Sequence, residues 1–438
     1  MRILIGILMS GALAASAQAQ LRLPIAPLPA LPVQKLTQTL GQAGADSLDQ
    51  LSQLRRLQIG QLIRANPHTL AADPHGNAIV RDELLAYSPT AQALEAAQAR
   101  GFKILREQSS GELGLELVVL QPPPMKIAKA LQQLRAADPA GVYDFNHVYT
   151  GSGQVAASNA SSAAAPVTGA GARAEGTSAR RVGLVDSGID TAHAVFHDAV
   201  IHSWGCGGRV LASAHGTAVA SLLIGQADRF HGVLDKAELY AADVYCNAPT
   251  GGAVDALAAA FAWLAQQRVA VINVSLVGPD NAALSALVHA LVGRGYLLVA
   301  AVGNDGPAAP PLYPASYPGV VGVTAVDAHR RVLIEAARGN QVMFAAPGAD
   351  MAAADVGEKY AIVRGTSFAA PIVTGLLALA VTMPDVRGST AALDALAQSA
   401  IDLGPPGRDL TYGFGLVGAE SRTDPASLGP LNRPRQKD

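Results

Sequence analysis

Residues 181–188 read RVGLVDSG, and this stretch indicates the class of fold. Its apolar run, 182–185, ends at an acidic residue and a Ser-Gly pair, which is typical of a buried strand that enters a turn. Further apolar runs follow, separated by helical patterns: the runs cover 239–244, 269–275 and 296–302, and the helices 252–267 and 281–293. This alternation predicts an α/β fold with a doubly wound, mostly parallel sheet covered on both faces.

A different pattern precedes this region. Residues 68–150 show the order strand, helix, strand, strand, helix, strand, which predicts a small α+β domain of the ferredoxin-like type. Residues 151–180 consist mainly of Gly, Ser and Ala, the composition of a flexible linker. We therefore expect a small domain at 68–150, a linker at 151–180 and a main domain at 181–420.

The overall composition narrows the classes of function. The chain has 438 residues, and its 32 basic and 34 acidic residues leave a net charge of −2. The length indicates two domains with linkers, and the hydrophobic half of the sequence excludes global disorder. A charge near zero lacks the basic surface that binds nucleic acid, so no nucleic-acid partner is expected. We expect a monomer.

The first residues predict export. Residues 1–19, MRILIGILMSGALAASAQA, combine an Arg, a short apolar stretch and a small-x-small end, which is the pattern of a secretory signal peptide. We expect a secreted or periplasmic protein. Residues 20–67 read as a Pro-rich segment and one or two amphipathic helices. These helices are either a partner-binding arm or an extension packed on the next domain, and we favour the extension.

No membrane span is expected in the mature chain, because the longest later apolar stretch, 372–383, is too short. Residues 421–438 read as a polar tail. The two cysteines, Cys206 and Cys246, predict one disulfide in an exported protein, and the alternative is two buried free thiols. His193 and His197 lie four residues apart, but no carboxylate completes a ligand set. No metal or cofactor is predicted.

Three residues at predicted element boundaries carry chemistry as a set. Asp186 ends a strand, His215 opens a helix, and Ser367 opens another long apolar helix. Each alone reads as a cap, turn or structural residue. Together they supply a nucleophile, a base that takes its proton, and a carboxylate that orients and stabilises the base. A nucleophile at a helix N-terminus also faces backbone N–H groups that stabilise negative charge.

The surrounding segments resemble the subtilisin-like serine protease family, the subtilases, over about residues 181–420. The similar blocks are VDSGID at 185–190, HGTAVAS at 215–221 and GTSFAAP at 365–371. The resemblance implies that Asp186, His215 and Ser367 form the catalytic triad of an endopeptidase that acts through an acyl-enzyme. This order of residues along the chain is that of subtilisin.

The same resemblance implies further site residues. Asn304, in AAVGNDG at 300–306, matches the side chain that stabilises the oxyanion together with the Ser367 N–H. Two segments match the strands that bind the substrate backbone and line the primary specificity pocket: Ser275, Leu276, Val277 and Gly278, and Ala300, Ala301, Val302 and Gly303. The Tyr313–Pro314 bond matches a cis bond of the family.

The small domain resembles the inhibitor-type propeptide of these proteases. That resemblance implies that it assists folding and then acts as an intramolecular inhibitor, with residues 145–150 in the active site. The maturation bond would lie between about Tyr149 and Arg181. The alternative is a permanently attached accessory domain.

The sequence therefore predicts an exported serine endopeptidase that acts on polypeptides and is made as a self-processing precursor. A protease dedicated to one partner protein is an alternative that the sequence leaves open. A noncatalytic binding module on a protease scaffold is less favoured, because none of the four reactive residues is lost. An α/β-hydrolase esterase is excluded, because it requires the order Ser, Asp, His and a G-x-S-x-G turn.

Overall fold

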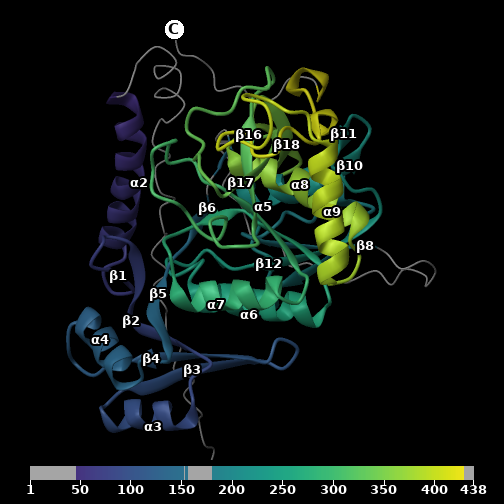
Figure 1. Cartoon of the computed structure of the whole chain (residues 1–438). Helices are drawn as coiled ribbons and strands as arrows, with labels where there is room; N and C mark the ends of the chain where they lie inside the picture. The colour runs from purple at the N-terminus through teal and green to yellow at the C-terminus, as the bar shows by residue number, and fades with distance from the viewer. Residues whose placement is uncertain (1–45, 152, 156–179, 429–438) are drawn as a thin grey trace, which may run out of the picture.

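The structure is a computed structural model, and it describes residues 46–151, 153–155 and 180–428. The predicted signal peptide, the Pro-rich segment, most of the predicted linker and residues 429–438 of the predicted tail lie outside the described residues. Figure 1 shows a large domain with a smaller domain beneath it and helix α2 standing beside both.

The large domain is built on a seven-stranded sheet in which every neighbouring pair of strands is parallel. The order is β17-β16-β15-β13-β8-β12-β9. The strands are β8 (Arg180–Asp186), β9 (Val200–Trp204), β12 (Ala237–Asp243), β13 (Val271–Val274), β15 (Leu297–Ala301), β16 (Val321–Val326) and β17 (Val342–Pro347). The predicted doubly wound α/β fold is confirmed.

Helices cover both faces of this sheet because the strand side chains alternate between two apolar cores. Leu184 belongs to one core and its neighbour Val185 to the other. The helices on the Leu184 side are α5 (Ala214–Ile224), α8 (Thr366–Ala380) and α9 (Val386–Ser399), and those on the Val185 side are α6 (Val254–Gln266) and α7 (Ala282–Val292). Figure 1 shows α6 and α7 between the sheet and the small domain.

Short strands surround the main sheet. β18 (Met351–Asp355) and β19 (Lys359–Arg364) form an antiparallel hairpin that leads into α8. β10 (Gln226–Ala227) pairs with β11 (Phe230–His231). β14 (Leu276–Val277) pairs with β6 (Thr150–Gly151), and β7 (Gln154–Val155) pairs with β19. The last two pairings join the N-terminal part of the chain to the large domain.

The small domain is an antiparallel sheet backed by two helices. Its elements are β1 (Leu70–Ala72), β2 (Ala78–Tyr87), α3 (Ala91–Ala99), β3 (Lys103–Ser110), β4 (Leu115–Gln121), α4 (Ile127–Ala137) and β5 (Val142–His147). The order β5-β2-β4-β3 is that of a ferredoxin-like sandwich, with β1 added against β2. The elements run in the predicted order, and β1 is the one that the sequence pattern did not indicate.

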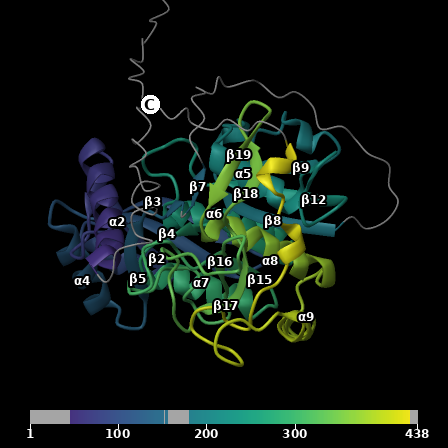
Figure 2. The ribbon, with the colours of Figure 1, turned by 90° about the horizontal axis from the view of Figure 1, so that it is seen from above.

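Helix α2 (Asp46–Ala65) lies within the predicted helical extension. Its Ile59, Leu62 and Ile63 pack on an apolar cluster that contains Leu70 of the small domain and Ala253 of the large one. Seen from above, α2 and α9 lie on opposite sides of the molecule (Figure 2). Among the described helices, none combines the length and the apolar character that crossing a membrane requires.

Two covalent details match the sequence-based predictions. Cys206 and Cys246 form a disulfide, and their Cα atoms are 5.1 Å apart. The Tyr313–Pro314 peptide bond is cis. His193, considered above as a metal ligand, instead uses both ring nitrogens locally: Nδ1 accepts from the Val195 N–H, and Nε2 lies 3.0 Å from the Lys359 carbonyl oxygen. It is therefore a structural residue.

Candidate active site

The three predicted triad residues lie at the ends of elements in the large domain. Asp186 is the last residue of β8, His215 lies in the first turn of α5, and Ser367 lies in the first turn of α8. Asp186 and His215 meet, with Oδ1 of the carboxylate 2.8 Å from Nδ1 of the imidazole. A carboxylate accepts hydrogen bonds, so Nδ1 carries the proton and Nε2 is left as the basic nitrogen.

The Asp186 carboxylate is held in a buried, hydrogen-bonded position. It is 1% exposed, and its Oδ1 accepts from both the backbone N–H and the hydroxyl of Ser187. Burial lowers the pKa of His215, the Asp186 charge and hydrogen bond raise it, and the net shift is upward. Among the described residues, His215 Nε2 has no hydrogen-bond partner. The pair thus presents a strengthened base with a free basic nitrogen.

Ser367 contacts Ser275, which lies between β13 and β14. The Ser275 hydroxyl donates to the Ser367 carbonyl at 3.0 Å, and the Ser367 Oγ lies 3.4 Å from the Ser275 carbonyl oxygen. The chain enters α8 through Gly365, whose φ of 138° and ψ of 166° suit glycine alone. The ring of Phe368, the next residue along α8, lies 5.4 Å from the His215 ring, so the two helix starts face each other.

Asn304 lies against the same helix start. Its Oδ1 accepts from the Thr366 N–H at 3.1 Å, and the Gly303 N–H donates to the Thr366 hydroxyl at 3.2 Å. Because the amide oxygen is turned toward Thr366, the Nδ2 group is the end that can donate to a substrate oxygen. The structure therefore places Asn304 against Thr366, the residue before Ser367.

The two predicted substrate-binding segments, 275–278 and 300–303, are buried in the structure. Gly278 forms a β-bridge with Tyr313, which links the first segment to the chain beyond the second. Leu312 lies against the second segment: a Cβ placed on Gly303 would come within 2.5 Å of Leu312 Cδ1.

The chain's own residues 148–151 and 153–155 lie against several segments of the large domain. Val148 bridges to Ala253, and the Tyr149 N–H donates to the Gly252 carbonyl at 2.8 Å. Beyond Tyr149 the chain continues into β6, paired with β14, and then into β7, paired with β19. Composition assigned residues 151 and 153–155 to a linker, but here they lie in strands or between them, because backbone pairing needs no apolar pattern.

Two glycines of this segment place it on the candidate catalytic residues. A Cβ on Gly151 would lie 3.8 Å from His215 Nε2, and a Cβ on Gly153 would lie 3.1 Å from Ser367 Cβ. The first glycine therefore lies beside the base and the second beside the nucleophile. Tyr149 is fully buried, and its hydroxyl donates to the Pro279 carbonyl oxygen at 2.5 Å.

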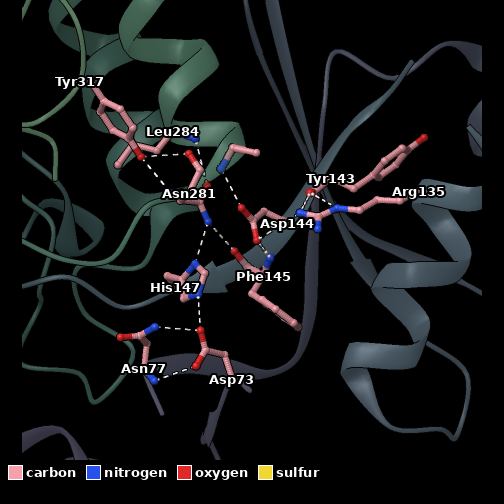
Figure 3. Close-up of polar contacts among 11 residues, drawn as sticks. Asp73, Asn77, Arg135, Tyr143, Asp144, Phe145, His147, Asn281, Leu284 and Tyr317 are labelled. Carbon is pink, nitrogen blue, oxygen red and sulfur yellow. Dashed lines mark hydrogen bonds and ion pairs between the residues drawn. The ribbon is translucent and has the colours of Figure 1, made fainter. Parts of the chain in front are cut away.

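A buried polar cluster fastens β5 to the start of α7 (Figure 3). Asn281 Nδ2 donates to His147 Nδ1 at 2.9 Å, and His147 Nε2 lies 3.2 Å from Asp73 Oδ2. Burial raises the pKa of the Asp73 carboxyl. Hydrogen bonds, of which the one from His147 has the largest effect, outweigh burial and bring the pKa to about 2. Asp144 Oδ2 also accepts from the Ala282 N–H at 2.7 Å, at the N-terminus of α7.

Sequence reasoning missed this cluster, because its members look like ordinary strand and cap residues. Asn281 does cap α7 through Leu284, and this is the only signal that it gives in the sequence. Within the described residues, one group has three atoms close enough to hold a metal ion: Cys206, Asp243 and Cys246. Its two sulfurs form the disulfide and offer no thiolate.

Comparison with known proteins defines the family. The sequence model of the Subtilase family matches residues 177–415. The chain belongs to the subtilase family.

Individual relatives agree with this assignment. Subtilisin DY of Bacillus licheniformis is 30% identical over 250 residues, covering 55% of this chain and 89% of that protein. Subtilisin Savinase of Lederbergia lenta is 33% identical over 214 residues, covering 48% and 78%. Minor extracellular protease Epr of Bacillus subtilis is 30% identical over 208 residues, covering 47% of this chain and 32% of that protein. The chain thus matches about a third of the length of that last relative.

The fold is also similar to a solved structure. Fervidolysin from Fervidobacterium pennivorans, a keratinolytic enzyme related to subtilisin, has a TM-score of 0.62 at 20% sequence identity. The similarity covers 82% of this chain and 62% of that one, so it extends beyond the family match at 177–415.

Proposed function

We propose that the protein is an exported serine endopeptidase that cleaves polypeptides. Ser367 Oγ attacks the scissile carbonyl carbon while His215 Nε2 accepts its proton, and the same imidazole then protonates the leaving amine. Asp186 holds the imidazole in the reactive tautomer and stabilises its charge. Asn304 and the Ser367 N–H donate to the oxyanion, and water hydrolyses the acyl-enzyme. Export is supported by the predicted signal peptide and by the disulfide.

One observation carries this proposal: the chain's own residues 149–151 and 153–155 pair with or lie against the large domain beside His215 and Ser367. β6 adds to β14 as a substrate strand would, and β7 adds to β19 on the other side of Ser367. We propose that the N-terminal part is a propeptide, which occupies this site and inhibits the enzyme until it is released.

We further propose that self-processing cuts the Ser152–Gly153 bond. Gly151 lies near His215 and Gly153 near Ser367, and these two positions support a cut immediately before Gly153. The sequence alone limited the cut only to the region between Tyr149 and Arg181. Parallel sheets with long-range contacts fold slowly, and a domain bound to α6 and α7 would favour the folded sheet.

The test is the fate of the full-length chain. Wild-type protein should cut itself and yield a new N-terminus at Gly153, whereas Ser367→Ala should stay intact. Ser399→Ala, on the exposed end of α9, serves as the matched control and should process normally. Normal self-processing by Ser367→Ala would remove Ser367 as the nucleophile. A protease dedicated to one partner would use the same chemistry, and digestion of unfolded casein by the mature enzyme separates general from dedicated proteolysis.

A further inference from the structure

Asn304 lies in a bend whose own backbone does little to fix its position. Gly303 and Gly306 flank the bend with φ angles of 100° and 102°, which glycine adopts far more readily than other residues. A group that stabilises a transition state must nevertheless be held to within about 0.5 Å of its working position. Contacts from outside the bend must therefore hold Asn304 in place.

Residues 335–337, which lie between β16 and β17, bind both ends of this bend. The Gly306 N–H donates to the Glu335 carbonyl oxygen at 2.8 Å, and the Ala337 N–H donates to the Gly303 carbonyl oxygen at 3.0 Å. The two glycines are thus fixed through their backbone groups by one short segment. The position of Asn304 depends on the position of that segment.

The side chain of Glu335 joins this segment to the strand that leads into the nucleophile helix. Its Oε1 accepts from Arg364 Nε at 2.6 Å, and its Oε2 accepts from Arg364 Nη2 at 2.9 Å. The Glu335 side chain is 7% exposed and that of Arg364 is 31% exposed. Arg364 is the last residue of β19, two positions before Thr366 of α8. Because two parallel hydrogen bonds join two planar groups, the pair fixes their orientation as well as their distance.

The ion pair completes a closed ring of contacts around Asn304. On one side the Thr366 N–H donates directly to Asn304 Oδ1. On the other side the connection runs from Gly306 to the Glu335 backbone, and from the Glu335 side chain to Arg364. A mostly buried ion pair adds little stability over an apolar pair of the same size, so its contribution here is to fix geometry.

We propose that Glu335 and Arg364 are positioning residues of the oxyanion site. Their ion pair sets where Asn304 Nδ2 lies relative to the Ser367 N–H, and it acts on the reaction through Asn304. This inference rests on the proposed peptidase activity, because it assigns a role in that reaction to two residues. Neither residue was singled out by the sequence.

The test measures kcat and KM of the mature enzyme, obtained from the full-length chain, on one chromogenic peptide amide. Glu335→Gln removes the charge and one acceptor at nearly constant size, and Arg364→Lys keeps the charge but loses the planar pair of donors. Each should lower kcat by roughly 10- to 100-fold and leave KM within about threefold of wild type. In an Asn304→Ala background neither change should lower kcat further by more than about twofold, because the group that the pair positions is gone.

Arg331→Gln is the matched control: it breaks an exposed ion pair with Asp327 in the same loop and should keep the wild-type kcat. An unchanged kcat in Glu335→Gln and Arg364→Lys would overturn the inference, as would an equal loss with and without Asn304. If Glu335→Gln does not fold, Arg364→Lys, which retains the charge pair, decides alone. Failure of the wild type to cleave the peptide or casein would instead overturn the proposed function, and this inference with it.

Discussion

Tyr149 should be the main anchor of the propeptide strand on the large domain. Its side chain is fully buried against Gly278, and its hydroxyl donates to the Pro279 carbonyl oxygen. Removing a buried aromatic side chain costs about 3–5 kcal/mol, and removing the hydroxyl hydrogen bond alone costs about 0.5–1.5 kcal/mol. Tyr149→Ala should therefore weaken propeptide binding by roughly 10²- to 4 × 10³-fold, and Tyr149→Phe by roughly 2- to 10-fold.

The assay is dilution of the self-processed complex, with recovered activity on a fluorogenic peptide measured at each concentration. The midpoint gives the dissociation constant of the cut propeptide. Leu105→Ala, an exposed apolar residue of β3 that is 41% accessible, is the control and should leave the midpoint unchanged. A midpoint for Tyr149→Ala within about threefold of wild type would refute the reasoning, because a buried anchor cannot be lost at so small a cost.

Three further changes test the site itself. Asn304→Ala should lower kcat by about 10²–10³, the size of the effect known for a subtilisin-type oxyanion donor, and should change KM little. An unaltered kcat would show that Asn304 does not stabilise the oxyanion. Gly153→Ala should slow self-processing in a gel time course, because its Cβ would lie 2.6 Å from the Phe368 ring. Gly151→Ala should be tolerated, because its Cβ would lie 3.8 Å from the nearest atom. The acid limb of kcat/KM should lie above pH 6.5, because the net shift raises the pKa of His215 and only the neutral imidazole acts as base. Asp186→Asn should move the acid limb to lower pH. An acid limb at unchanged pH would show that Asp186 does not raise the pKa of the base, His215.

The direction of the pH effect also holds after maturation. In the structure, where Gly151 and Gly153 lie beside the site, burial lowers the pKa of His215 and the Asp186 charge raises it. Release of the propeptide strand removes part of the burial but not the carboxylate. The mature enzyme should therefore keep a raised pKa for this imidazole, and activity should be lost as the pH falls through that value.

Local sequence was sufficient for the main sheet, whereas the candidate triad was predicted from the three residues as a set and from the resemblance to the subtilases. Apolar runs such as 182–185 are long enough to mark buried parallel strands, and Asp186, His215 and Ser367 each lie at a boundary between an element and a loop. The disulfide followed from two cysteines and a predicted export signal. These features depend on residue type and short spacing, which a single sequence displays directly.

Other elements gave no such signal. The strand β18 reads MAAAD, and alanine is a strong helix former that is depleted in strands. Its residues are nevertheless all buried in a hairpin with β19, so tertiary packing overrides local preference. The ion pair of Arg55 and Asp305 joins residues 250 positions apart (305 − 55), and neither residue has neighbours in the sequence that identify the other.

The central claim is that Ser367 is a nucleophile activated by His215 and Asp186 in an enzyme that releases its own propeptide. The most direct measurement is labelling of the self-processed protein with a serine-reactive phosphonate, followed by mass spectrometry of the intact and digested chain. The account predicts a single adduct on Ser367 and a mature chain that begins at Gly153. An adduct on another residue, or no adduct on a protein that still cleaves peptides, would contradict it.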